Sequence, residues 1–194
     1  MNYLAHIFLS SSPQEQVGNF IGDFVKGKDF EKYPTEIQKG ILLHRAIDYF
    51  TDTHPTVIAT KALLRDTFGR YAGIVADLYF DHFLAVHFYD YSSKKLKKFA
   101  RKFYWSLWWN RKLLPPRVKG FLWHFISTNR LCRYATFDGL RSSINIMSQY
   151  KSFPISSDEA IKFLQENYQV LDENFKLFFP ELIDFANSTR AKNP

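Results

Sequence analysis

Ionisable side chains follow one edge of an otherwise apolar stretch, GILLHRAIDYFTDTHP, at residues 40–55. His44, Asp48 and Asp52 succeed one another at intervals of four residues, which places them along one side of a helix. Arg45 lies beside them. Such imidazole and carboxylate groups either bind a common ligand or form a solvated edge with local ion pairs, which is the usual meaning of charges at this spacing.

Other apolar segments also carry isolated ionisable groups. Asp23 lies in GNFIGDFVKG and His6 lies in NYLAHIFL. Asp77 and Asp81 are one helical turn apart in an aromatic run. Carboxylates rarely enter such surroundings unless they are paired, hydrogen-bonded or bound to metal. Several helices therefore each offer a ligand, and a helical bundle can direct these ligands to a shared point.

Mixed imidazole and carboxylate ligands suit manganese, iron, magnesium or zinc. One or two such ions acidify a water and hold phosphate oxygens during hydrolysis of a phosphodiester. Two cationic side chains lie near these positions, since Lys26 closely follows Asp23 and Arg45 follows His44. Both are able to hold a phosphate, although ordinary salt bridging is the more common role for a residue such as Lys26. The pattern predicts a helical, metal-dependent hydrolase.

The elements that position these groups are predicted to be helices. Ser12 and Glu15 form a capping box, and Gly27 is the predicted end of the helix that this box opens. Pro34 opens the helix that carries residues 40–55. Further helices are predicted at 56–68, 73–88, from Ser92 or Ser93 to about 112, 118–134, 137–150, and from 156 to 179, where Pro180 interrupts or ends the helix.

Composition favours one all-α domain over residues 1–194. The chain has only 8 Gly and 8 Pro, too few for the turns of an all-β chain, and its 18% aromatic residues predict a thick aromatic core. The single Cys132 excludes an internal disulfide and a cysteine-based zinc cluster. The N-terminus lacks the basic segment of a secretory signal, and no uncharged apolar run reaches the ~18 residues of a membrane span. We therefore predict a soluble, cytoplasmic helical bundle.

The net charge of +7 is distributed unevenly along the chain. Between Asp90 and Asp138 the chain has 12 of its 26 Lys and Arg residues and no Asp or Glu, whereas the remainder is net acidic. A basic segment of this kind favours an anionic partner, which can be nucleic acid, a membrane surface or an acidic protein.

Four segments carry a resemblance to a known family. NYLAHIFLS, GNFIGDFVKG, GILLHRAIDYFTDTHP and DLYFDHFLAVHF occur in this order within residues 1–88. Together they resemble the acyl carrier protein phosphodiesterase family, also called ACP hydrolase. The resemblance implies an all-helical fold distantly related to the HD phosphohydrolases. It also implies hydrolysis of the phosphodiester that joins 4′-phosphopantetheine to a serine of acyl carrier protein.

The resemblance further implies a divalent metal, with Mn²⁺ favoured and Mg²⁺ or Fe²⁺ as alternatives. The motif positions with polar side chains are His6, Asn19, Asp23, His44, Arg45, Asp48, Asp52, Asp77, Asp81 and His82. The expected metal ligands are His6, Asp23, His44, Asp48 and Asp81. The expected catalytic groups are Asp23, His44 and Asp48, with Arg45 and Lys26 stabilising charge on the phosphoryl oxygens. The chain contains no His-Asp dipeptide, in contrast to the wider superfamily.

A basic segment has a role in this interpretation, because acyl carrier proteins are acidic and a basic surface steers them in. The expected docking surface comprises Lys94, Lys95, Lys97, Lys98, Arg101 and Lys102. The same segment contains Tyr104, Trp105, Trp108 and Trp109. The equally weighted alternative is a solvated helix face whose aromatic residues pack into the core.

Two other functions remain open at this point. The first keeps the metal site but acts on a nucleotide or another small phosphodiester, because a fold does not fix a substrate. The second is a non-catalytic nucleic-acid-binding module, which the basic, Trp-rich segment favours. The acidic residues of the first ninety positions do not fit the second alternative, so a nucleic-acid partner is not expected.

Overall fold

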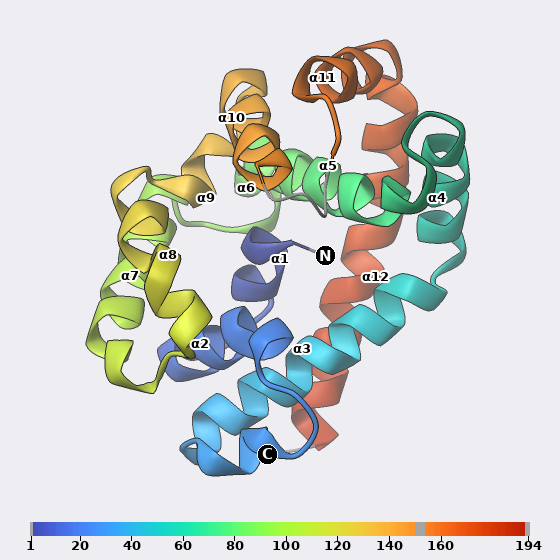
Figure 1. The fold of residues 1–194 in the computed structure, drawn as a ribbon. Coiled ribbons are helices and arrows are strands. Elements are labelled where there is room, and N and C mark those ends of the chain that lie inside the picture. The colour runs from blue at the N-terminus through green and yellow to red at the C-terminus, as the bar shows by residue number, and fades with distance from the viewer. Residues whose placement is uncertain (1, 150–153, 193–194) are drawn as a thin grey trace.

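The structure is a computed structural model that describes residues 2–149 and 154–192. Within those ranges it contains helices and no β-strand, which confirms the predicted all-α fold (Figure 1). The first helices are α1 (Tyr3–Phe8), α2 (Pro13–Ile21), α3 (Thr35–Thr53), α4 (Pro55–Phe68), α5 (Ala72–Val86) and α6 (Phe88–Tyr91). The later ones are α7 (Leu96–Trp109), α8 (Pro116–Ser127), α9 (Arg130–Arg133), α10 (Phe137–Ser148), α11 (Ser157–Glu166) and α12 (Tyr168–Lys192).

Short 3₁₀-helices connect several of these elements: η1 (Gly22–Phe24), η2 (Asp29–Lys32), η3 (Gly69–Tyr71) and η4 (Arg111–Leu113). The short α1 lies near the middle of the ribbon in Figure 1, with α2 and α3 below it and α5 above it. The long α12 runs along the side of the molecule that α3 and α4 share. In the described part of the chain, no helix is both long and apolar enough to cross a membrane.

The helices share one core, and it is rich in aromatic side chains as the composition predicts. Most residues of α5 are buried, and they contact the buried face of α12. Phe80 stacks on Phe178, and Phe175 stacks on both Phe83 and Phe179. On the other side of the core, Phe20 of α2 packs against Phe103 of α7. Burial of rings from so many helices holds them in a single domain.

The closest contact between helices is the crossing of α2 and α3. Gly18 and Gly40 face each other there, and a Cβ atom on Gly40 would lie only 2.2 Å from the carbonyl oxygen of Glu15. A Cβ atom on Gly18 would lie 2.1 Å from the carbonyl oxygen of Ile37. The two backbones therefore touch, which only residues without a side chain permit. This approach brings the side chains that follow on α2 and α3 to one place.

Helix ends differ from the sequence prediction in the first third of the chain. The amino-terminal residues 3–8 form α1, which we did not predict. The helix opened by Ser12 ends at Ile21 instead of Gly27, and the chain continues as η1 because Gly22 packs directly against the ring of His44. The Pro34-initiated helix is confirmed, and it ends at Thr53 before Pro55.

Further differences concern the later helices. The predicted helix 118–134 is divided into α8 and α9 by Asn129, whose φ of 49° is left-handed, a conformation that Asn tolerates. The basic helix begins at Leu96 rather than Ser92 or Ser93, and it ends at Trp109. The prediction of a helix up to Tyr150 lies partly outside the described residues, since α10 ends at Ser148.

The end of the chain corrects one prediction about proline. Residues 156–179 form two helices that separate at Asn167, and α12 continues through Pro180 to Lys192. Phe178 and Phe179 before the proline and Leu182 after it are fully buried. Burial on both sides of Pro180 outweighs the loss of one backbone hydrogen bond, so the helix does not end there.

We predict that Gly40→Ala lowers the free energy of unfolding by about 1–3 kcal/mol, because its methyl group would meet the backbone of α2. The measurement is urea denaturation followed by circular dichroism. Gly120→Ala in α8 is the matched control, since nothing lies within 4 Å of a Cβ atom there. The control variant should be more stable than the wild type by about 0.5–1 kcal/mol. Equal stability of the two variants would contradict a backbone contact at Gly40.

Candidate functional site

Two histidines and one aspartate from different helices meet beside the α2–α3 crossing. His6 lies at the end of α1, and its ring stacks on that of His44 with centroids 4.1 Å apart. The Nε2 atom of His6 lies 3.2 Å from Asp48 Oδ1, and the Nε2 atom of His44 lies 3.1 Å from Asp48 Oδ2. One ligand atom from each residue lies within 4.8 Å of the others. Both histidines are buried, whereas the Asp48 side chain is 39% exposed.

Asn19 of α2 fixes the orientation of both rings. Its Nδ2 donates to the carbonyl oxygen of His6 and to Ser10 Oγ, which leaves its Oδ1 to accept from His6 Nδ1 at 2.8 Å. The backbone oxygen of Asn19 accepts from His44 Nδ1, also at 2.8 Å. Each ring thus uses its Nδ1 proton in a hydrogen bond and directs Nε2 toward Asp48. Histidines that ligate metals are held by this kind of hydrogen bond in proteins generally.

The electrostatics of this group follow from its burial. Burial and the neighbouring charge of His44 lower the pKa of His6 to about 4. Burial also lowers the pKa of His44, but the carboxylates of Asp23 and Asp48 outweigh it and raise that pKa to about 9. Burial alone would raise the pKa of Asp48, and its bonds with the two imidazoles hold it well below the usual range. The carboxylate is therefore ionised, and it attracts a positive charge to the space between the rings.

A small cavity opens beside these residues. It has a volume of about 200 Å³ and is lined by Gly22, Asp23, Val25, Lys26, Gly27, His44, Arg45 and Asp48. Asp23 stands at its exposed edge, with Oδ1 3.3 Å from His44 Nε2, and this bond lowers the pKa of Asp23. Arg45 donates to the carbonyl oxygens of Val25 and Gly27. The cavity thus has two carboxylates, an imidazole and two cationic side chains on its walls.

A family model described as acyl carrier protein phosphodiesterase matches residues 1–182. The chain belongs to this family. Relatives named acyl carrier protein phosphodiesterase include proteins from Enterobacter sp. (strain 638) and Serratia proteamaculans (strain 568). The former is 30% identical over 100% of this chain and 98% of its own length, and the latter is 30% identical over 96% and 97%.

A relative of the same name from Escherichia coli O45:K1 (strain S88 / ExPEC) is 29% identical over 96% of this chain and 98% of its own. No solved structure matches the chain. Membership of the family confirms the resemblance seen in the four sequence segments, and the family is one of phosphodiester hydrolases. The distant relation to the HD phosphohydrolases stays a prediction.

The structure places the predicted site residues of this family member in two groups. His6, Asp23, His44, Asp48, Arg45 and Lys26 all lie at the cavity or at the histidine pair beside it. Asp52 does not, because it is exposed and pairs with Lys61 of α4 at 2.6 Å. His82 lies apart as well, with its Nδ1 donating to the carbonyl oxygen of Tyr134.

Asp81 is also separate from the histidine pair. Its two oxygens accept from the backbone N–H groups of Leu4 at 2.8 Å and Ala5 at 3.1 Å, so it caps the amino end of α1. Burial raises the pKa of Asp81 to about 7 in spite of these bonds. Its place in the structure is therefore at the helix that carries His6, one turn before that histidine. A buried carboxylate in an aromatic run has the same sequence signature whether it caps a helix or binds a metal.

Gly22 and Asn19 contribute to the site in ways that the sequence did not predict. Gly22 leaves room for the imidazole of His44, since a Cβ atom there would lie 2.2 Å from its Cγ. The glycine before Asp23 in GNFIGDF is the only signal of this contact. Asn19 was named as a motif position, but its hydrogen bonds to both histidines require two helices to cross and have no local sequence pattern.

We predict that the two histidines titrate far apart in the chelator-treated protein. His44 should hold its proton up to about pH 9, whereas His6 should lose its proton above about pH 4. Asp48→Asn removes one of the carboxylates that raise the pKa of His44 and should lower it. The measurement is an NMR titration of the imidazole nitrogens. Asp52→Asn is the control and should leave both curves unchanged; two titrations near pH 6.5 would contradict the geometry.

We predict that Asp81→Ala destabilises the fold, because it leaves the N–H groups of Leu4 and Ala5 without their acceptor. The expected loss is about 1–3 kcal/mol for each N–H group, measured by urea denaturation. Asp66→Ala, at an exposed position of α4, is the control and should change stability by less than about 0.5 kcal/mol. An Asp81→Ala protein of wild-type stability that no longer binds divalent metal would instead make Asp81 a ligand.

Proposed function

We propose that this chain is a metal-dependent phosphodiesterase that acts on holo acyl carrier protein. It hydrolyses the phosphodiester between 4′-phosphopantetheine and a serine of the carrier protein, and it releases apo carrier protein and 4′-phosphopantetheine. The observation that carries the proposal is the convergence of His6 Nε2, His44 Nε2 and the Asp48 carboxylate beside an open cavity. Membership of the phosphodiesterase family supports the substrate.

The residues present fit a divalent cation. Both Nδ1 atoms are committed to Asn19, so each Nε2 faces the ionised Asp48 carboxylate, and His44 Nε2 would offer its lone pair once a cation displaced its extra proton. His6, His44 and Asp48 would hold the ion, with Asp23 close enough to join them. When bound, a divalent cation lowers the pKa of a water and neutralises charge on phosphoryl oxygens. Mn²⁺ remains the expected ion, with Mg²⁺ or Fe²⁺ as alternatives.

The chain's own side chains have distinct tasks in the reaction. Asp23 is 67% exposed at the edge of the cavity and ionised, so it can orient the attacking water and accept its proton. The oxygen of water bonds to phosphorus, the bond from phosphorus to the serine oxygen breaks, and that oxygen takes a proton. Arg45 has N–H donors beyond those used on Val25 and Gly27, and with Lys26 it stabilises the phosphoryl oxygens.

A basic surface is the proposed docking site for the acidic carrier protein. The side chains at its centre lie just before α7 and in its first half, and all are exposed: Lys94, Lys95, Lys97, Lys98, Arg101 and Lys102. No acidic residue lies in the segment between Asp90 and Asp138, so nothing in that segment neutralises them. Opposite charges on the two proteins would accelerate their encounter.

The cytoplasmic location of the protein also stays a prediction.

The experiment that tests this function is a mass-spectrometric assay with holo acyl carrier protein and Mn²⁺, with and without chelator. Chelator-sensitive loss of the 4′-phosphopantetheine group that leaves an unmodified serine is the expected result. If nucleotides or other small phosphodiesters are hydrolysed and the carrier protein is not, the substrate of this site is a small phosphodiester instead of the carrier protein. Salt-sensitive binding of single-stranded nucleic acid, with no metal uptake and no hydrolysis, would overturn the enzyme proposal altogether.

We predict that Asp48→Asn abolishes metal binding and hydrolysis while the helical content stays unchanged. Even residues that only support metal ligands lower affinity by 10–100-fold when replaced, so loss of this carboxylate should lower affinity by more than about 100-fold. Calorimetry with Mn²⁺ and the hydrolysis assay measure the two effects. The matched control is Asp52→Asn, one turn further along α3, which should leave the metal affinity and the rate of hydrolysis at the wild-type level. Equal behaviour of the two variants would remove Asp48 from the site.

A further inference from the structure

All the tryptophans of the chain are exposed, and they gather on two helices. Trp105, Trp108 and Trp109 lie on α7 with exposures of 65%, 41% and 81%, and Trp123 lies on α8 with 69%. The rings of Trp108 and Trp123 are 6.2 Å apart, so the two helices contribute to one surface. We call these four residues the tryptophan face. Such large apolar rings are ordinarily buried for most of their area, and an exposed cluster marks an interaction surface.

The sequence of α7 explains why its rings point outward. Residues 105, 108 and 109 have the spacing of one helix face, whereas Ala100, Phe103, Tyr104 and Leu107 lie on the other face and are buried. The helix therefore has two apolar sides, and only one of them packs on the core. Of the four aromatic residues singled out in the sequence of this segment, only Tyr104 is buried as the core-packing alternative requires, and the three tryptophans are exposed.

Basic side chains surround the tryptophan face. Those exposed on the two helices and on η4 between them are Lys97, Lys98, Arg101, Lys102, Arg111, Lys112, Arg117 and Lys119. The guanidinium of Arg111 lies 4.9 Å from the ring centre of Trp108. There is no Asp or Glu between Asp90 and Asp138, so the charge of this surface is of one sign.

We propose that the tryptophan face attaches the protein to the surface of an anionic lipid bilayer. Indole rings favour the boundary between lipid and water, because their bodies are apolar and their N–H groups remain hydrated. Lysines and arginines beside them are attracted to anionic head groups. The exposed indole rings therefore suit the lipid–water boundary, and the basic side chains suit the anionic head groups.

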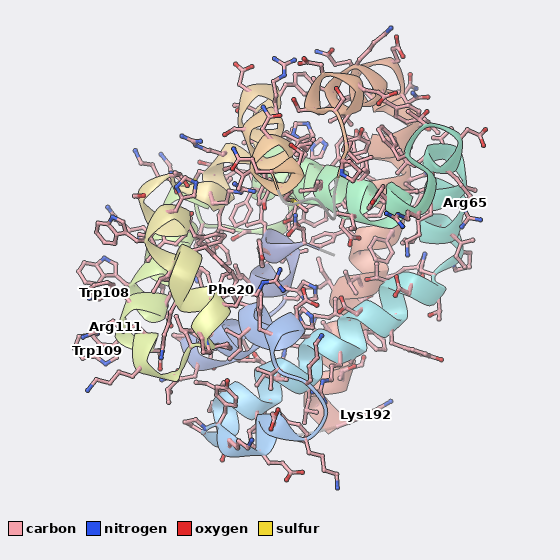
Figure 2. The ribbon with its side chains drawn as sticks, viewed as in Figure 1. Phe20, Arg65, Trp108, Trp109, Arg111 and Lys192 are labelled. Carbon is pink, nitrogen blue, oxygen red and sulfur yellow. The ribbon has the colours of Figure 1, made fainter. Side chains whose placement is uncertain are left out.

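The tryptophan face lies toward the carboxyl end of α7 and on α8, whereas the proposed docking surface for the carrier protein begins ahead of α7 at Lys94. Figure 2 shows Trp108, Trp109 and Arg111 projecting outward from the edge of the molecule that α7 forms. The indole rings distinguish the two partners, because a lipid surface takes up exposed rings, whereas steering of an acidic protein requires only the charges.

Intrinsic fluorescence reports on this face directly, because no tryptophan lies elsewhere. The full chain is mixed with vesicles of phosphatidylcholine, with or without phosphatidylglycerol, and binding is also measured by co-sedimentation. We expect a blue shift of emission and co-sedimentation with the anionic vesicles, both weakened by salt. Absence of both with anionic vesicles would overturn the proposal. A blue shift caused by holo acyl carrier protein but not by vesicles would assign the face to an acidic protein instead, and would also overturn it.

Matched variants separate the apolar and charged contributions. Trp109→Ser and Trp123→Ser should each weaken vesicle binding about tenfold, because each withdraws an exposed ring from the lipid. Leu177→Ser, which replaces a 64% exposed residue of α12, should have no effect. Arg111→Gln should weaken binding to anionic vesicles about fivefold, whereas Arg65→Gln, at the opposite edge of Figure 2, should not. Unchanged binding by both tryptophan variants, with circular dichroism as in the wild type, would overturn the proposal.

Discussion

The fold is arranged around two imidazole rings, those of His6 and His44, whose orientations are fixed so that neither ring donates a hydrogen bond to the other. Each Nδ1 proton is committed to Asn19, so the Nε2 atoms present lone pairs to an ionised carboxylate. Three acceptors in one place repel one another unless a positive charge lies among them. In the protein alone that charge is the extra proton that His44 holds, as its raised pKa indicates. A divalent cation, as proposed for this site, would satisfy the same requirement, and His6, His44 and Asp48 would hold it.

Several distant features serve this arrangement. His6 reaches the site only because the short α1 is fixed at its amino end by Asp81, a buried residue of α5. Asn19 reaches both rings only because Gly18 and Gly40 let α2 and α3 touch. His44 keeps its place because Gly22 has no side chain to displace it. The aromatic core, with its rings from α5, α7 and α12, supplies the rigidity that such close positioning requires.

The sequence predicted the fold class, and the structure brings most of the candidate site residues together. The limits of these predictions have physical causes. Periodicity along one helix correctly places His44 and Asp48 together, but Asp52 continues the same row and points to Lys61 instead. Periodicity predicts the side of a helix on which a residue lies, but it does not predict which neighbouring helix that side contacts. Helix ends at Asn129 and Asn167 have no glycine or proline to signal them, and Pro180 signals an end that packing overrides.

The same limit explains the two sides of α7. Phe103 and Leu107 repeat at the spacing of a buried helix face, and Trp105 and Trp109 repeat at that spacing on the opposite side. From the sequence alone either stripe is suited to the core. The choice is made by α2, because Phe103 meets Phe20 there, and the indole rings are left outside with the basic residues. An apolar helix face that folding leaves exposed to water, beside charges of one sign, is unfavourably solvated. Attachment to a lipid surface, as proposed for this face, would cover the indole rings and remove that unfavourable solvation.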